Sequence, residues 1–191
     1  MGIESFHEFL LAQIDLSEEE WEYISSFFFP KNFKKNTIVL REGEVENHLY
    51  FIEKGAARYY LINGDGKEIC LLFTFTNWFM GEMSSFLTKE PSLCFIETLS
   101  ETTAWRIHRS DLLKIYDNTR MGDRIGRLAM EQLYIRKAQR ERILLSETAE
   151  QRYIDLMRKA PHVLQQVPLK HIASYLGITP QALSRIRRRI S

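Results

Sequence analysis

Hydrophobic residues follow different spacings in successive parts of the chain. Residues 3–29 repeat them at helical spacing, and Ser17 followed by Glu20 matches a capping box at a helix start. Between Thr37 and Trp105 the pattern changes to six to eight short runs rich in β-branched and aromatic residues, separated by turn sequences such as NGDG. NGDG is a strong hairpin signal because Asn and Gly accept positive φ angles. These runs predict an antiparallel β-roll or jelly roll with flanking helices.

The chain returns to helical spacing after Ser110, which we predict as an N-cap. Seven positions, mostly apolar in the first half and polar in the second, then recur with alternating steps of four and three, the spacing of a coiled coil. One interpretation is a helix that packs on its own domain. The other, which the spacing favours, is a parallel helix pair that joins two subunits, with glutamines that help to fix its register. The recurring positions are Met121, Ile125, Leu128, Gln132, Ile135, Gln139 and Arg142.

The last part of the chain has the spacing of two short helices joined by a tight turn. Gly177 suits a left-handed turn between them, Thr179 can cap the second helix, and Pro180 suits its first position. Apolar residues on both helices would fix the angle between them, as in a helix-turn-helix. The inward-facing positions are Ile172, Ala173, Leu176, Leu183, Ile186 and Ile190.

Charge is unevenly distributed. The 191 residues carry a formal net charge of +1, whereas residues 161–191 contain five Lys and Arg and no Asp or Glu. Residues 1–160 therefore carry a formal charge of −4, since the two parts together make +1. An acidic body with a basic C-terminal module indicates an anionic partner for that module, with nucleic acid as the first candidate.

The outward face of the second helix carries the candidate DNA contacts. Gln181 can recognise adenine, and Arg185 can bind guanine in a bidentate manner, while the other arginines suit phosphates. A generic helical hairpin would account for the apolar positions but not for four arginines on an acid-free surface. The predicted DNA-binding residues are Thr179, Gln181, Ser184, Arg185, Arg187, Arg188 and Arg189.

Several function classes lack support in the sequence. The five histidines show no HxH or HExxH spacing, so we predict no metal site and no catalytic residues. Cys70 and Cys94 lie in apolar stretches, where we expect buried, reduced thiols, although a disulfide between them stays open. No apolar run is long enough for a membrane span, and the N-terminus has no signal-peptide pattern. We therefore expect a cytoplasmic protein that is not an enzyme.

Over roughly Asn36 to Ile190 the sequence resembles the Crp/Fnr superfamily of bacterial transcription regulators. The resemblance rests on IVLREGEVENHLYFIEKGAARYYLINGDGKEI, on NWFMGEMSSF with its Gly-Glu pair, and on ASYLGITPQALSRIRRRI. It implies an α+β fold in three parts: a cyclic-nucleotide-binding-like sensor domain over residues 1–115, a dimerisation helix over 116–145, and a helix-turn-helix DNA-binding domain over 146–191. Gly43, Gly55 and Gly66 stand at the turn positions of the family.

The resemblance also implies a ligand pocket, with departures from the family pattern. In members that bind cyclic AMP, Glu82 would face the ribose hydroxyl and an Arg-Ser pair about ten residues later would hold the phosphate. Here those two positions are Ser92 and Leu93, and the Thr-Ser pair expected on the long helix is replaced by Lys137 and Ala138. We therefore expect an unidentified small-molecule effector, or none, rather than cyclic AMP; the cysteines of the iron–sulfur branch are missing, and a haem sensor stays open. The implied pocket residues are Gly81, Glu82, Met83, Ser84, Ser92, Leu93 and Lys137.

The leading hypothesis is a homodimeric, allosterically controlled regulator that binds double-stranded DNA, with RNA polymerase as a further partner. The family's DNA-binding domain continues into a β-hairpin wing, and the sequence ends at Ser191 before such a hairpin. The alternative is a small-ligand sensor that acts through a protein partner, with the basic helix as a docking surface. A jelly-roll metal enzyme is the third class, and the missing histidine pairs argue against it.

Overall fold

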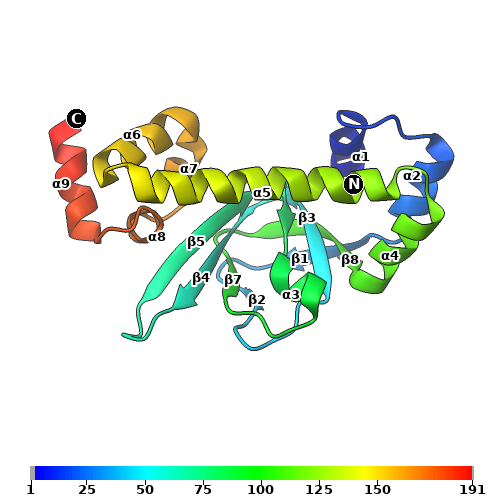
Figure 1. The fold of residues 1–191 in the computed structure, drawn as a ribbon, viewed down its shortest axis with the longest axis horizontal. Coiled ribbons are helices and arrows are strands. Elements are labelled where there is room, and N and C mark those ends of the chain that lie inside the picture. The colour runs from blue at the N-terminus through cyan, green and yellow to red at the C-terminus, as the bar shows by residue number, and fades with distance from the viewer. Residues whose placement is uncertain (1–2, 191) are drawn as a thin grey trace. The chain divides into compact units, whose positions relative to one another are not determined.

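The computed structural model describes residues 3–190 and divides into two compact units (Figure 1). The first unit comprises the residues up to Arg58 together with Phe73–Gln132, and the second comprises Tyr59–Leu72 together with the residues from Leu133 onward. The helices are α1 (Glu4–Leu11), α2 (Glu18–Ser25), α3 (Met83–Thr88), α4 (Arg109–Asn118), α5 (Gly122–Ser146), α6 (Ala149–Lys159), α7 (Pro161–Gln166), α8 (Leu169–Tyr175) and α9 (Pro180–Ile190). The strands are β1 (Phe29–Phe33), β2 (Ile38–Leu40), β3 (His48–Lys54), β4 (Ala56–Ile62), β5 (Glu68–Phe75), β6 (Phe79–Met80), β7 (Phe95–Thr98) and β8 (Thr102–His108).

The strands form two four-stranded sheets with the orders β1-β8-β3-β6 and β2-β7-β4-β5. In the first sheet β3 pairs antiparallel with two neighbours, so that Phe51 lies opposite Trp105 on β8 and opposite Phe79 on β6. Strand β7 alternates between half-buried and buried residues, as expected of a strand with one face on the core. The predicted α+β fold with an antiparallel β-roll, a long helix and C-terminal helices is confirmed.

The core of the first unit is aromatic and includes the N-terminal helices. The ring of Phe6 on α1 lies 4.7 Å from that of Phe28 and 4.8 Å from that of Phe51 on β3. Ile115 of α4 and Met121 belong to the same buried cluster. Figure 1 shows α1, α2 and α4 grouped around the start of α5. Burial of each large side chain stabilises the unit by about 1.5–3 kcal/mol, which explains why these helices pack on the β-roll.

The NGDG sequence forms the predicted turn between β4 and β5, although by a different mechanism at Asn63. The Asn63 side-chain oxygen accepts hydrogen bonds from the backbone N–H groups of Asp65 at 3.1 Å and Lys67 at 2.9 Å. Among the four residues of this sequence only Gly66 has a positive φ, of 74°. Asn63 thus closes the turn with its side chain rather than by adopting a left-handed backbone.

Residues 3–29 contain α1 and α2, and the predicted capping box at Ser17 is present at the start of α2. The helical part ends before Phe29, which begins β1. The predicted N-cap of α4 is wrong. Ser110 is not the N-cap of α4: the cap is His108, whose Nδ1 accepts the Ser110 N–H at 3.2 Å. His108 still has the extended backbone of β8, so its imidazole reaches the first turn of the helix.

In the first half of α5, the predicted coiled-coil positions contact other residues of the same chain. Ile125 and Leu128 pack against the core of the first unit, and the side-chain amide of Gln132 donates to the side-chain oxygen of Gln13 at 2.9 Å. In the second unit Ile135 is 53% exposed. The first half therefore follows the interpretation of a helix packed on its own domain. Dimerisation through the second half and the boundaries at residues 115 and 145 stay predictions.

Candidate nucleic-acid interface

Helices α8 and α9 form the predicted helix-turn-helix. Gly177 has a φ of 73° between them, and the N–H of Ile178 donates to the Ala173 carbonyl at 3.0 Å, which closes the end of α8. The Thr179 hydroxyl accepts the N–H of Ala182 at 3.2 Å, and α9 begins at Pro180. The sequence therefore folds locally as predicted because each turn residue supplies the conformation or hydrogen bond that its position requires.

The inward face of this pair is apolar and buried. Ile172, Ala173, Leu176, Leu183 and Ile186 are all buried, and Ile190 is half-buried.

Arg152 of α6 braces the turn, and sequence reasoning missed it. Its Nε and Nη2 atoms donate to the Leu176 carbonyl at 3.1 and 2.9 Å, and Nη1 donates to the Glu147 carbonyl at 2.6 Å. The Leu176 carbonyl lies at the end of α8, where no N–H group of the same helix can donate to it. The two bonds from Arg152 therefore satisfy this carbonyl. The Thr148–Gln151 capping box places Arg152 in the first turn of α6, but no sequence signal indicates its distant partner.

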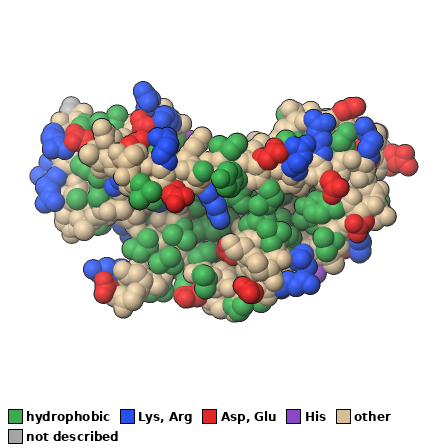
Figure 2. All heavy atoms as spheres, viewed as in Figure 1, with side chains coloured by type: hydrophobic (Ala, Val, Ile, Leu, Met, Phe, Trp, Pro, Cys, Tyr) green, Lys and Arg blue, Asp and Glu red, His purple; other side chains and the backbone are tan. Residues whose placement is uncertain are grey.

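The outward face of α9 is polar and exposed. All of the predicted DNA-binding residues are exposed, and Figure 2 shows Lys and Arg side chains on the surface where α6 and α9 lie. The helix buries Leu183 and Ile186, so its rotation about its own axis is fixed. Gln181, Ser184, Arg185 and Arg188 lie on the face opposite these two residues. The other predicted contacts are Thr179 at the start of the helix and Arg187 and Arg189 on its flanks.

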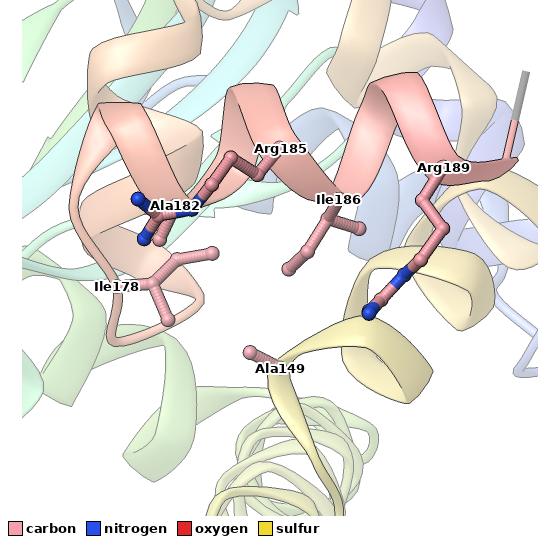
Figure 3. Close-up of a pocket in the computed structure, with 6 residues that line it drawn as sticks. All are labelled: Ala149, Ile178, Ala182, Arg185, Ile186 and Arg189. Atoms are coloured by element: carbon pink, nitrogen blue, oxygen red, sulfur yellow. The ribbon is translucent and has the colours of Figure 1, made fainter.

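An open groove of about 360 Å³ lies between the start of α6 and α9 (Figure 3). Figure 3 shows the Arg185 side chain beside Ala182 and the Arg189 side chain extending toward α6. Arg189 forms an ion pair with the Glu150 carboxylate of α6. A phosphate at this position would compete with the Glu150 carboxylate for Arg189. The groove is lined by Ala149, Ile178, Ala182, Arg185, Ile186 and Arg189.

The predicted ligand residues of the first unit are engaged with the chain itself. Glu82 is the N-cap of α3, and its carboxylate accepts the N–H of Ser84 at 3.2 Å and the N–H of Ser85 at 2.7 Å. Ser92 is buried, and its hydroxyl donates to the Cys94 carbonyl at 2.9 Å and accepts the Cys94 N–H at 3.2 Å. Leu93 is 81% exposed.

The other members of the predicted ligand set lie in two places. Gly81, with a φ of 156°, directly precedes α3, and Met83 and Ser84 open that helix. Lys137 lies on α5 in the second unit and is exposed. The structure thus brings residues 81–84 together in one turn.

Glu46 is a buried carboxyl next to this turn that sequence reasoning did not single out. It is 4% exposed, and its oxygens accept the N–H of His48 at 3.1 Å and the N–H of Glu82 at 3.4 Å. Its own N–H donates to the Ser85 hydroxyl at 2.9 Å. Burial, reinforced by the charge of Glu82, raises the pKa of Glu46 to about 7 even though the backbone bonds favour its ionised form.

The comparisons with known proteins agree with this architecture. The family model of the cyclic nucleotide-binding domain matches residues 30–119, the segment from β1 to the end of α4. This part of the chain is therefore similar to cyclic nucleotide-binding domains. A comparison of the sequence with curated proteins finds no match.

Solved structures extend the resemblance over most of the chain. FixK2 from Bradyrhizobium japonicum is 18% identical with a TM-score of 0.71, over 85% of this chain and 84% of its own. The c-di-GMP-responsive regulator CLP from Xanthomonas campestris is 16% identical with a TM-score of 0.70, over 91% of both chains. A protein from Eubacterium rectale described as a Crp/Fnr-family regulator is 18% identical with a TM-score of 0.71, over 92% of this chain and 83% of its own. The predicted resemblance to Crp/Fnr regulators is thus confirmed for the fold.

The side chains around α3 do not fit a cyclic nucleotide in the manner that the resemblance implies. Both oxygens of Glu82 already bond the first turn of α3, and the Ser92 hydroxyl already bonds Cys94. Leu93 offers no charge to a phosphate, whereas the nearby Glu46 carboxyl would repel one when ionised.

The described residues contain neither a metal cluster nor a membrane helix. Over residues 3–190, no group of three or more His, Cys, Asp or Glu side chains could hold a metal ion. Within the same range, no helix is both long and apolar enough to cross a bilayer. Cys70 and Cys94 are buried and form no disulfide.

Proposed function

We propose that the protein is a sequence-specific DNA-binding regulator of transcription and not an enzyme. The observation that carries the proposal is the exposed, acid-free face of α9 on a helix whose rotation is fixed by buried Leu183 and Ile186. A helix of this kind enters the major groove with its polar side chains toward base edges. Gln181 and Arg185 supply hydrogen-bonding groups for adenine and guanine, and the remaining arginines supply charge for phosphates.

The proposed active form is a homodimer joined through the second half of α5. Tyr134, Ile135 and Leu145 of this helix are 73%, 53% and 82% exposed. Ile135, Ala138, Arg142 and Leu145 follow one another with steps of three, four and three, so a second copy of α5 could bury them in one seam. A dimer of this kind would place two α9 helices in successive major grooves of a palindromic site.

The β-roll would control the dimer through an effector. This effector would not be a cyclic nucleotide bound with its ribose at Glu82 and its phosphate at an Arg-Ser pair. This part of the proposal is supported by the internal bonds of Glu82 and Ser92. A transcription regulator works on chromosomal DNA, so we assign it to the cytoplasm and propose RNA polymerase as a further partner.

The test begins with selection of bound duplexes from a random pool, followed by affinity measurements on the selected duplex and a scrambled one. Arg185→Ala should lower affinity for the selected duplex by roughly 5–150-fold, because a bidentate arginine–guanine pair contributes about 1–3 kcal/mol. Its affinity for the scrambled duplex should fall much less. Arg188→Ala should weaken both alike and reduce the salt slope by about 1 if it contacts phosphate.

Arg127→Ala is the matched control, because it removes one positive charge from α5, where Arg127 pairs with Glu131 at 2.8 Å. Its affinities should equal those of the wild type. Equal losses on both duplexes for Arg185→Ala would remove the assignment of a base contact. No binding to any duplex at low salt would leave the basic helix as a docking surface for a protein.

A further inference from the structure

The helix-turn-helix is fastened to the β4–β5 hairpin by a serine. The Ser174 hydroxyl of α8 accepts the N–H of Cys70 at 2.8 Å and donates to the carbonyl of Glu68 at 3.1 Å. These two residues belong to β5, which lies at the end of its sheet. Backbone groups two residues apart point to the same side of a strand, so one hydroxyl serves as both donor and acceptor for this edge.

A second contact ties the same helix to α5. The guanidinium carbon of Arg140 lies 3.6 Å from the centroid of the Tyr175 ring, and its Nη2 atom donates to the Tyr175 carbonyl at 2.8 Å. A stacked and hydrogen-bonded arginine is held in one orientation. Ser174 and Tyr175 are neighbours at the end of α8, so both contacts act on one point of the helix-turn-helix.

We propose that Ser174 and Arg140 form a clasp that positions the helix-turn-helix for the simultaneous reading of two half-sites. One compact unit contains the tip of the β4–β5 hairpin, the second half of α5 and the helix-turn-helix. The polar face of α9 stays exposed while the clasp is closed.

The expected consequence follows from effective concentration. Once one half-site is bound, the second α9 helix binds from within the same complex, and its effective concentration depends on how rigidly it is held. A loosened helix-turn-helix keeps its contacts to one half-site but loses part of this advantage on the full site. This inference rests on the proposed DNA-binding function and dimer.

The test compares full-length wild type with Ser174→Ala by hydrogen exchange at the Cys70 amide and by binding to a full palindromic duplex and to an isolated half-site. Cys70 is 1% exposed, and its N–H donates to Ser174, so its exchange rate reports on the clasp. We expect exchange at Cys70 to accelerate about tenfold as one hydrogen bond is lost. Affinity for the full site should fall about fivefold or more, while affinity for the half-site stays unchanged.

Three variants make the outcome specific. Ser174→Thr keeps the hydroxyl and should restore both readouts. Arg140→Ala should weaken full-site binding in the same direction. Ser146→Ala is the matched control, since its hydroxyl bonds only the Arg142 carbonyl within α5 at 2.8 Å, and it should behave as wild type.

Unchanged exchange at Cys70 in Ser174→Ala would overturn the clasp. Equal losses on the half-site and the full site would overturn its positioning role. If the wild type binds no duplex, the proposed function is wrong, and so is the role of the clasp in binding two half-sites. Faster exchange at Cys70 in Ser174→Ala would in that case still support the attachment of α8 to β5.

Discussion

Glu46 is a buried carboxyl of the β-roll whose ionisation depends on its burial. Its carboxylate accepts the backbone N–H groups of His48 and Glu82. The charge of Glu46 acts on Tyr50, whose pKa is raised to about 12 by burial and by this charge. No Lys or Arg takes part in the hydrogen bonds of Glu46 described above. Below pH 7 the carboxyl is therefore mainly protonated in the folded state.

We predict that Glu46 makes the free energy of unfolding depend on pH. Its pKa is about 7 in the folded state and near 4.5 in the unfolded state, so the folded state binds the proton more tightly. Its contribution to stability is full below pH 4.5, falls as the pH rises toward 7, and is lost above that value. The loss is about 3 kcal/mol, and denaturant unfolding of wild type and Glu46→Gln between pH 4 and 8 measures it.

Glu46→Gln should flatten this part of the pH dependence, because the amide is neutral at every pH. Glu101→Gln, which changes an exposed carboxylate, is the control and should follow the wild type. Parallel pH curves for Glu46→Gln and the wild type would contradict the prediction.

The exposed polar face of α9 could be predicted from sequence, and the residues that support its helix-turn-helix could not. Gln181, Arg185 and their neighbours follow from one helix whose period separates apolar from polar positions. Arg152 and Ser174 act through partners 24 and more than 100 positions away in the chain. Local patterns carry no information on such contacts, which depend on how the elements pack.

At the scale of elements, a helix start could be predicted where the capping residue stands in a known sequence pattern. It was missed where the capping residue is the last residue of the preceding strand. Ser17 and Thr179 accept hydrogen bonds from residues three positions ahead, as their patterns indicate. His108 took the place predicted for Ser110 because β8 runs directly into α4. The β-roll was predictable as a set of strands, but the order of its two sheets depends on pairings between distant segments.

We predict that the exposed part of α5 holds the dimer together. Ile135→Glu would place a charge in the proposed seam and remove apolar contact worth about 1.5–3 kcal/mol, so the dimer dissociation constant should rise at least tenfold. Sedimentation equilibrium measures this constant. Because Ile135 is 53% exposed within one chain, thermal unfolding at low protein concentration should change little.

Leu113→Glu is the matched control, since Leu113 is similarly exposed but lies on α4. It should leave the dissociation constant unchanged. A dimer unaffected by Ile135→Glu would show that two copies meet elsewhere.

At the scale of the whole molecule, acidic and basic residues are separated along the chain. The acidic residues are confined to positions before 161, and the five basic side chains beyond it accompany α8 and α9. In the proposed complex with DNA, long-range attraction would therefore be concentrated on the helix-turn-helix, and the phosphate backbone would repel the net negative charge of residues 1–160. Such a distribution favours approach to the duplex with α9 foremost.

We predict that the distance between half-sites controls affinity for the full site. Insertion of about five base pairs turns the second half-site to the opposite face of the duplex, and a dimer held by α5 cannot then reach it. The affinity should fall to that of an isolated half-site. Ile135→Glu is the critical comparison, because a monomer binds each half-site independently and should not respond to the insertion. If the dissociated variant were as sensitive to spacing as the wild type, the dependence would reside in the DNA and not in the dimer.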